Sequence, residues 1–115
     1  MTPLSIKIES SGRTCTVACE GDLDRSSAGL FESCLAPGFA GAADRVVFEL
    51  AGLDIGDGLG IAAAVSLVKH LRGEGRAVFL VAAPQMLAHN LYKNGLLAGP
   101  GAVQLHNTRQ DEPYG

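Results

Sequence analysis

The segment at residues 53–60 constrains the fold of this chain more than any other part of the sequence. Before it, residues 46–50 form a short apolar run that begins with two β-branched valines, which is typical of a buried strand. After it, apolar residues recur at helical spacing from 61 to 72. The segment is therefore a strand-to-helix turn, whose glycines allow a tight turn and close approach by another molecule. In open α/β sheets, ligands and partners usually bind at this carboxyl end of a strand.

The other elements follow from the same periodicities. Alternating apolar residues or short apolar runs predict strands at residues 4–8, 14–20, 77–82 and 102–105. Helical spacing predicts two further helices, at residues 26–36 and 84–95. Strands joined through a helix run parallel with a right-handed crossover, whereas the second strand returns beside the first. The sequence therefore predicts a mixed sheet.

The helices carry predictable packing faces and ends. The first helix should bury one stripe, formed by Leu30, Phe31, Cys34 and Leu35. Gly73 is well placed to end the second helix, because glycine suits the backbone at a helix C-terminus. Gly95 should end the third helix, with Leu96 folded back on Leu91 as in a Schellman motif.

The three cysteines predict neither a disulfide nor a metal site. Cys15 and Cys19 lie on one predicted strand, roughly 13 Å apart, whereas a disulfide needs Cα atoms within about 7 Å. No CxxC spacing is present, and the three histidines share no metal-type spacing. We expect all three cysteines, including Cys34, to be small buried hydrophobic residues.

Composition limits the class of protein. A chain of 115 residues is expected to form one domain with its own core. Its 47% hydrophobic and 18% charged residues describe an ordinary globular protein. A net charge of −3 without a basic patch argues against nucleic acid as a partner. No apolar run approaches membrane-spanning length and no signal-peptide pattern opens the chain, so we expect a cytoplasmic protein that does not insert into membranes.

Polar residues gather where the second strand leads into the first helix. Leu23 continues the alternation of inward-facing residues along that strand, so its neighbours Asp22 and Asp24 face away from the core. Asp24 or Ser26 can cap the helix, because their oxygens accept the free N–H groups of a first turn. Ser26 and Ser27 are interpreted as helix-start residues. For Asp22, a solvated loop position and a contact with a partner remain equally open.

Three short motifs, in order along the chain, resemble the STAS domain family of anti-sigma factor antagonists. Residues 21–24 (Gly-Asp-Leu-Asp) resemble the family's Gly-Glu-Leu-Asp before the first helix. Residues 46–53 resemble its Val-Val-Leu-Asp-Leu-Ser-Gly-Val, and residues 94–97 resemble the Thr-Gly-Leu after its third helix. The resemblance covers roughly residues 4 to 106. It implies an α/β, STAS-like single domain over residues 1–106, with a mixed β-sheet and helices packed mainly on one face. The polar residues that follow, 107–115, are expected to form a flexible C-terminal tail.

The turn departs from the family pattern. Family members usually carry Asp-Ser-Ser-Gly-Leu-Gly there, and a kinase phosphorylates the second serine, which breaks the complex with the kinase partner. This chain carries Ile-Gly-Asp-Gly-Leu-Gly at residues 55–60. Matching Gly-Leu-Gly puts Asp57 at the phosphorylated position but requires two deleted residues; the alignment without a gap puts Gly58 there. Neither alignment supplies a hydroxyl, so the resemblance implies a domain without the usual phosphoserine switch.

Two interpretations of Asp57 stay open and are compatible. It can be a plain helix N-cap, since Asp is among the best residues for that position. It can also present a fixed negative charge beside the helix start, where the helix dipole favours an anion, to a basic group on a partner.

Catalysis is not indicated. A dinucleotide fingerprint would need glycine where Ile61 stands, and residues 54–58 lack the alternating oxygen ligands of a calcium loop. A phospho-accepting receiver domain would need an acidic pair after its first strand and a lysine near its last, but no lysine follows Lys93. No Cys/His or Ser/His/Asp set can be placed on one face, so we expect no enzyme activity, no catalytic residue, no metal and no cofactor.

The resemblance predicts a protein–protein interaction module in partner-switching regulation. Its partner would be an anti-sigma factor or serine-kinase-like protein, bound through Asp22, Asp24, Ser26, Ser27, Gly56, Asp57, Gly58 and Leu59. One alternative is a STAS subunit of a bacterial lipid-transport system that binds its transporter ATPase. Another is a sensor domain that binds a small ligand, such as a nucleotide or lipid, at the turn.

Overall fold

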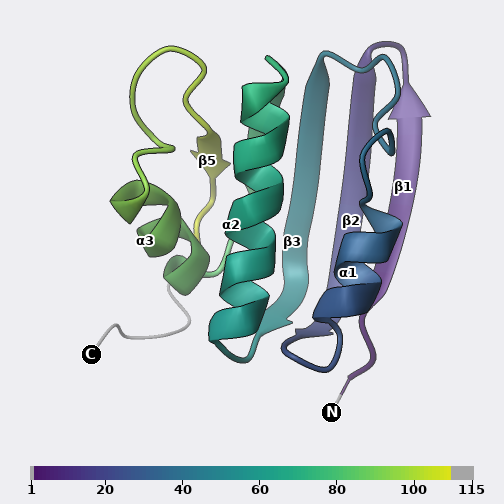
Figure 1. Cartoon of the computed structure of the whole chain (residues 1–115), viewed down its shortest axis with the longest axis vertical. Helices are drawn as coiled ribbons and strands as arrows, with labels where there is room; N and C mark the ends of the chain where they lie inside the picture. The colour runs from purple at the N-terminus through teal and green to yellow at the C-terminus, as the bar shows by residue number, and fades with distance from the viewer. Residues whose placement is uncertain (1, 110–115) are drawn as a thin grey trace.

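The computed structural model describes residues 2–109, in which five strands form one sheet and three helices cover one of its faces (Figure 1). The elements in chain order are β1 (Ser5–Ser11), β2 (Thr14–Leu23), α1 (Ala28–Cys34), β3 (Arg45–Ile55), α2 (Gly58–Gly73), β4 (Ala77–Val81), α3 (Gln85–Lys93) and β5 (Gln104–His106).

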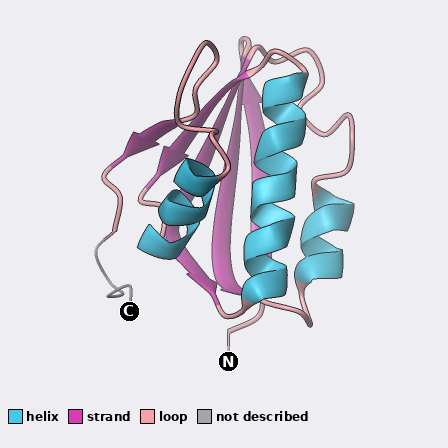
Figure 2. Cartoon of the chain, turned by 60° about the vertical axis from the view of Figure 1, so that its left-hand side comes forward, coloured by secondary structure: helices cyan, strands magenta, loops and turns pink. Residues whose placement is uncertain are grey.

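The sheet is mixed, as predicted. Its strands lie in the order β1-β2-β3-β4-β5, with β1 antiparallel to β2 and the remaining neighbours parallel. Turning the molecule shows the helices together on one side of the sheet (Figure 2). The predicted fold class is therefore confirmed. None of the helices within residues 2–109 has the length and apolarity needed to cross a membrane.

The core lies between the sheet and the three helices, and α2 contributes most of its helical residues. On β2, Cys15, Val17, Cys19 and Leu23 are buried, as their alternation predicts. On α2, the apolar residues that recur at helical spacing include Ile61, Ala64, Val65, Val68 and Leu71, and these five are also buried. Complete burial of one such aliphatic side chain contributes about 1.5–3 kcal/mol, so α2 is anchored mainly by this stripe.

β3 extends further than its sequence pattern predicts. Ala18 of β2 pairs with Glu49, and Glu20 pairs with Gly52, so β3 holds one extra residue at a bulge. Leu50 and Leu53 are therefore both buried although they lie three residues apart. The strand runs to Ile55, and the predicted turn at residues 53–60 shrinks to Gly56 and Asp57.

Two predictions about α1 are wrong. The helix is shorter than residues 26–36, and only Phe31 of the helix and Leu35 just after it are buried from the predicted stripe. Leu30 is 49% exposed and Cys34 is also exposed, so only two of the three cysteines are buried. Successive residues lie about 100° apart around a helix, so this short helix buries only Phe31, and Leu35 follows in line with it just after the helix.

Helices α2 and α3 end in the Schellman geometry, but at α2 the glycine differs from the predicted one. Gly73 is the last helical residue, and the left-handed residue is Gly75, with φ of 80°. The N–H of Arg76 then donates to Leu71 O at 3.2 Å. At α3 the prediction is confirmed: Gly95 has φ of 72° and Leu96 N–H donates to Leu91 O at 3.0 Å.

Candidate functional site

The ends of β2 and β3 lie side by side and carry the predicted site residues. Their registers match Asp22 with Asp54 and Leu23 with Ile55, and the strands run parallel. The connection from β2 into α1 and the turn from β3 into α2 therefore emerge at the same edge of the sheet (Figure 1). The structure brings together two groups of predicted residues, Asp22 to Ser27 at the end of β2 and just after it, and Gly56 to Leu59 at the start of α2 and just before it.

Asp57 joins these two connections. It is the N-cap of α2, with extended backbone, and its Oδ1 accepts hydrogen bonds from the N–H groups of Leu59 and Gly60, both at 3.0 Å. Its Oδ2 accepts a third bond, from Arg25 N–H at 3.0 Å. The cap follows from the sequence, whereas the bond to Arg25 spans 32 residues and was not predicted.

These bonds favour the charged form of Asp57. The backbone N–H of Gly60, followed by that of Arg25, lowers the pKa of the Asp57 carboxyl below its usual value, against a smaller opposing effect of desolvation. Nearby Asp24 opposes the shift through its own negative charge. Asp57 is therefore a fixed carboxylate at neutral pH.

Asp24 organises the start of α1. Its Oδ1 accepts from Ser26 N–H at 2.9 Å and from the Ser26 hydroxyl at 2.6 Å, and its carbonyl accepts from Ala28 N–H at 2.8 Å. The hydroxyl and backbone N–H of Ser26 lower the pKa of the Asp24 carboxyl. The predicted side-chain cap by Asp24 or Ser26 is wrong, because the Asp24 carboxylate accepts from Ser26, which precedes α1, and Ser26 is itself the donor.

Ser27 holds the two aspartates of this connection in place. Its hydroxyl donates to Asp22 O at 2.8 Å and accepts from Asp24 N–H at 3.0 Å. Ser27 occupies the N-cap position of α1, but its side chain makes no cap hydrogen bond. Both serine hydroxyls are thus engaged in the turn that precedes the helix.

Asp22 belongs to β2 and is not a residue of a solvated loop. Its N–H donates to Thr2 O at 2.9 Å, and its Oδ2 accepts from Thr2 N–H at 2.9 Å. Asp22 therefore pins the N-terminal segment to the sheet, and its side chain is half-buried.

The glycines of the turn have different roles. A Cβ on Gly60 would lie 2.5 Å from Leu23 O, so only glycine lets α2 start this close to the end of β2. A Cβ on Gly58 would have no neighbour within 4 Å, and the adjacent Leu59 is 54% exposed. The backbone at Gly58 and the side chain of Leu59 are therefore open to an approaching molecule.

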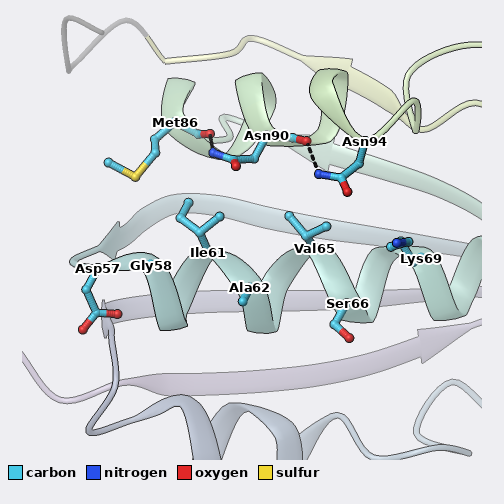
Figure 3. Close-up of a pocket in the computed structure, with 10 residues that line it drawn as sticks. All are labelled: Asp57, Gly58, Ile61, Ala62, Val65, Ser66, Lys69, Met86, Asn90 and Asn94. Atoms are coloured by element: carbon cyan, nitrogen blue, oxygen red, sulfur yellow. Dashed lines mark hydrogen bonds between the residues drawn. The ribbon is translucent and has the colours of Figure 1, made fainter. Parts of the chain in front are cut away.

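A groove between α2 and α3 begins at this turn (Figure 3). It has a volume of about 610 Å³ and contains apolar side chains from both helices, with Ile61 and Val65 facing Met86 and Asn90 across it. Asp57 lies at one end, with its carboxylate turned away from α3, and Lys69 lies toward the other. The sequence does not predict this groove, because residues 61–69 and 86–94 are brought together only by the packing of their helices.

The C-terminal segment also reaches the end of β3. The guanidinium of Arg109 donates to Ala51 O at 2.9 Å and to Leu53 O, and its backbone N–H donates to Ala83 O at 2.9 Å. Residue 109 lies in the segment that the sequence assigns to a loose tail; residues 110–115 of that segment lie outside the described residues.

The sequence model of the STAS domain matches residues 5–112. The chain belongs to the STAS domain family. No curated protein sequence matches this STAS domain significantly. Within residues 2–109, no group of three or more His, Cys, Asp or Glu side chains is arranged to hold a metal ion.

Solved structures share the fold of this STAS domain at low sequence identity. An anti-sigma factor antagonist from Mycobacterium paratuberculosis matches with a TM-score of 0.69 and 18% identity, over 95% of this chain and 90% of that chain. The phosphorylated form of SpoIIAA, a Bacillus cell fate determinant, matches with a TM-score of 0.64 and 16% identity, over 88% and 90%.

The same fold also occurs inside a transporter. The murine Solute Carrier 26 family member A9, an anion transporter, matches with a TM-score of 0.60 and 16% identity, over 85% of this chain but 17% of that chain. The fold is therefore shared between anti-sigma factor antagonists and a domain-sized part of a transporter.

Proposed function

We propose that this STAS domain is a non-catalytic protein-docking module in partner-switching regulation, and that its docking surface is permanently formed. That surface comprises Asp22, Asp24, Ser26, Ser27, Gly56, Asp57, Gly58 and Leu59. An anti-sigma factor or serine-kinase-like protein is the proposed partner. Membership of the family and the likeness to anti-sigma factor antagonists support this class of partner.

The observation that carries the proposal is the bonding of Asp57. One carboxylate accepts hydrogen bonds from Arg25 of the first connection and from Leu59 and Gly60 of α2. The two connections are thereby held together without an added phosphate. Gly58 and Leu59, between these bonds, remain open to a partner.

The proposal excludes regulation by phosphoserine at the turn, because residues 53–61 contain no hydroxyl side chain. We expect a partner captured from native cell extract to remain bound when ATP and Mg²⁺ are added. Intact-mass measurement of the STAS domain after that incubation should show no added phosphate between residues 53 and 61. An acyl phosphate on Asp57, released by hydroxylamine, would contradict the proposal and favour a receiver-like function.

Of the two alternatives, the first is an outcome of the same capture and the second has a test of its own. A transporter ATPase as the captured protein would replace the anti-sigma partner by a transport partner, as in the lipid-transport alternative. For the alternative of a small ligand, such as a nucleotide or lipid at the turn, the groove that begins there between α2 and α3 supports the proposal. Calorimetric titration with ATP and GTP tests it, and saturable heat that Lys69→Ala abolishes would make ligand binding the better account.

A further inference from the structure

β3 extends beyond the end of β4, the neighbouring strand that pairs with it. β4 pairs with β3 only as far as Val81 opposite Glu49, whereas β2 follows β3 to Ile55. On the β4 side, the backbone of β3 from Leu50 to Ile55 therefore has no strand partner within residues 2–109. An uncovered edge leaves its carbonyl groups in need of other donors.

The backbone geometry at Ala82 explains why β4 stops. Ala82 has φ of 57°, which turns the chain out of line with β3, and its N–H donates to His106 O at 2.8 Å. Pro84 follows as the N-cap of α3 and has no N–H to offer. The connection from β4 to α3 thus follows β5 and leaves the end of β3.

Arg109 fills this gap. Its guanidinium donates to the carbonyl oxygens of Ala51 and Leu53, which lie two residues apart and so face the same edge of the strand. Its backbone N–H donates to Ala83 O. One residue therefore connects the C-terminal segment, the β4–α3 connection and the end of β3.

The end of β3 in turn sets the position of the docking surface. Leu53 lies four residues before Asp57, and Gly56 N–H donates to Leu23 O at 2.9 Å. Any shift of β3 after the bulge therefore moves Asp57 relative to Arg25, its partner in the other connection.

We propose that Arg109 is a positioning residue: its hydrogen bonds to Ala51 and Leu53 hold the end of β3 and thereby keep the Asp57 turn in its docking arrangement. We call these two hydrogen bonds the latch. Release of the C-terminal segment would loosen residues 51–57 without opening the core, because β5 ends at His106, before the latch. The link to docking rests on the proposed function; the positioning of the turn does not.

Amide hydrogen exchange of the full chain tests the latch. In Arg109→Gln, whose side chain is too short to reach both carbonyls, we expect exchange at residues 51–57 and at Arg25 to quicken about tenfold, because local opening loses two hydrogen bonds. Arg109→Lys, which keeps the charge but offers one donor centre, should quicken it less. Exchange at residues 78–81 of β4 should not change.

Arg13→Gln is the matched control. It removes an exposed arginine that pairs with Asp44 at the opposite end of the sheet, so exchange at residues 51–57 should stay as in the unmodified chain. Unchanged exchange in Arg109→Gln, or an equal rise in β4, would overturn the latch. If Arg109→Gln does not fold, the same comparison is made with Arg109→Lys.

The effect of Arg109 on docking is measured separately, as the affinity for the captured partner. Affinity for the captured partner should fall in the order unmodified, Arg109→Lys, Arg109→Gln. Local loosening without any loss of affinity would overturn the claim that Arg109 positions the docking surface. If the unmodified chain captures no partner, the proposed function fails, and the exchange result still decides whether Arg109 holds the turn.

Discussion

At the scale of single residues, Asp57 does more than cap the start of α2. Both of its carboxylate oxygens have backbone donors, and these donors come from two separate segments of the chain. These three bonds use most of the acceptor capacity of the carboxylate and leave little of it for a basic group on a partner. We therefore interpret Asp57 mainly as the residue that shapes the surface, with its charge as a secondary contribution.

The charge of Asp57 gives a testable pH dependence. Its pKa is lowered in the folded state, so the stabilisation is fully present above the unfolded pKa, about 3.9, and is lost as pH falls through the folded value. Asp57→Asn should lower the melting temperature at pH 7, and the difference from the unmodified chain should shrink as pH falls below 4. Thermal unfolding monitored by circular dichroism at a series of pH values measures this. A difference that does not depend on pH would show that the charge is not what stabilises the turn.

At the scale of elements, the docking surface depends on how closely α2 starts against β2. Gly60 permits that approach, because any side chain there would meet the carbonyl of Leu23. Gly58, one half-turn earlier, points into open space and has no positive φ. Two glycines of one turn thus have opposite tolerance for a side chain.

This difference predicts opposite effects of the same substitution. Gly60→Ala should destabilise the domain by about 1–3 kcal/mol, since an overpacked contact forces the backbone to move. Gly58→Ala should be neutral or stabilise it by about 0.4–1 kcal/mol, because it restricts the unfolded chain without a clash. Urea unfolding of both variants gives the free energies, and equal destabilisation would contradict the close approach of α2 to Leu23.

Elements with regular apolar periodicity were predictable, and irregular ones were not. The spacing from Ile61 to Leu71 predicts the buried stripe of α2, and Gly95 with Leu96 predicts the end of α3. The residue at which β3 ends could not be predicted from the sequence, because a bulge breaks the alternation between Leu50 and Leu53. For α1, the sequence shows which residues are apolar but not that a short helix buries only one row.

At the scale of the whole molecule, the candidate site is assembled from parts that are distant in the sequence. The parallel arrangement of β2 and β3 follows from the order of elements, so the meeting of Asp22 and Asp57 at one edge could be predicted. The groove between α2 and α3 and the bonds of Arg109 to β3 could not, since they depend on tertiary packing. Arg109, which bonds the end of β3, and Asp22, which bonds Thr2, thus each join segments that are distant in the sequence.

The central claim is that a partner docks on the surface formed around Gly58. Gly58→Trp and Gly73→Trp test it as a matched pair, because both positions lie on α2, at opposite ends, and a Cβ at either would meet nothing within 4 Å. Both variants should stay folded, as judged by their melting temperatures. Calorimetric titration with the captured partner should show at least about a tenfold loss of affinity for Gly58→Trp, equivalent to about 1.4 kcal/mol, and no change for Gly73→Trp. Equal affinity of the folded Gly58→Trp domain and the unmodified chain would contradict the account.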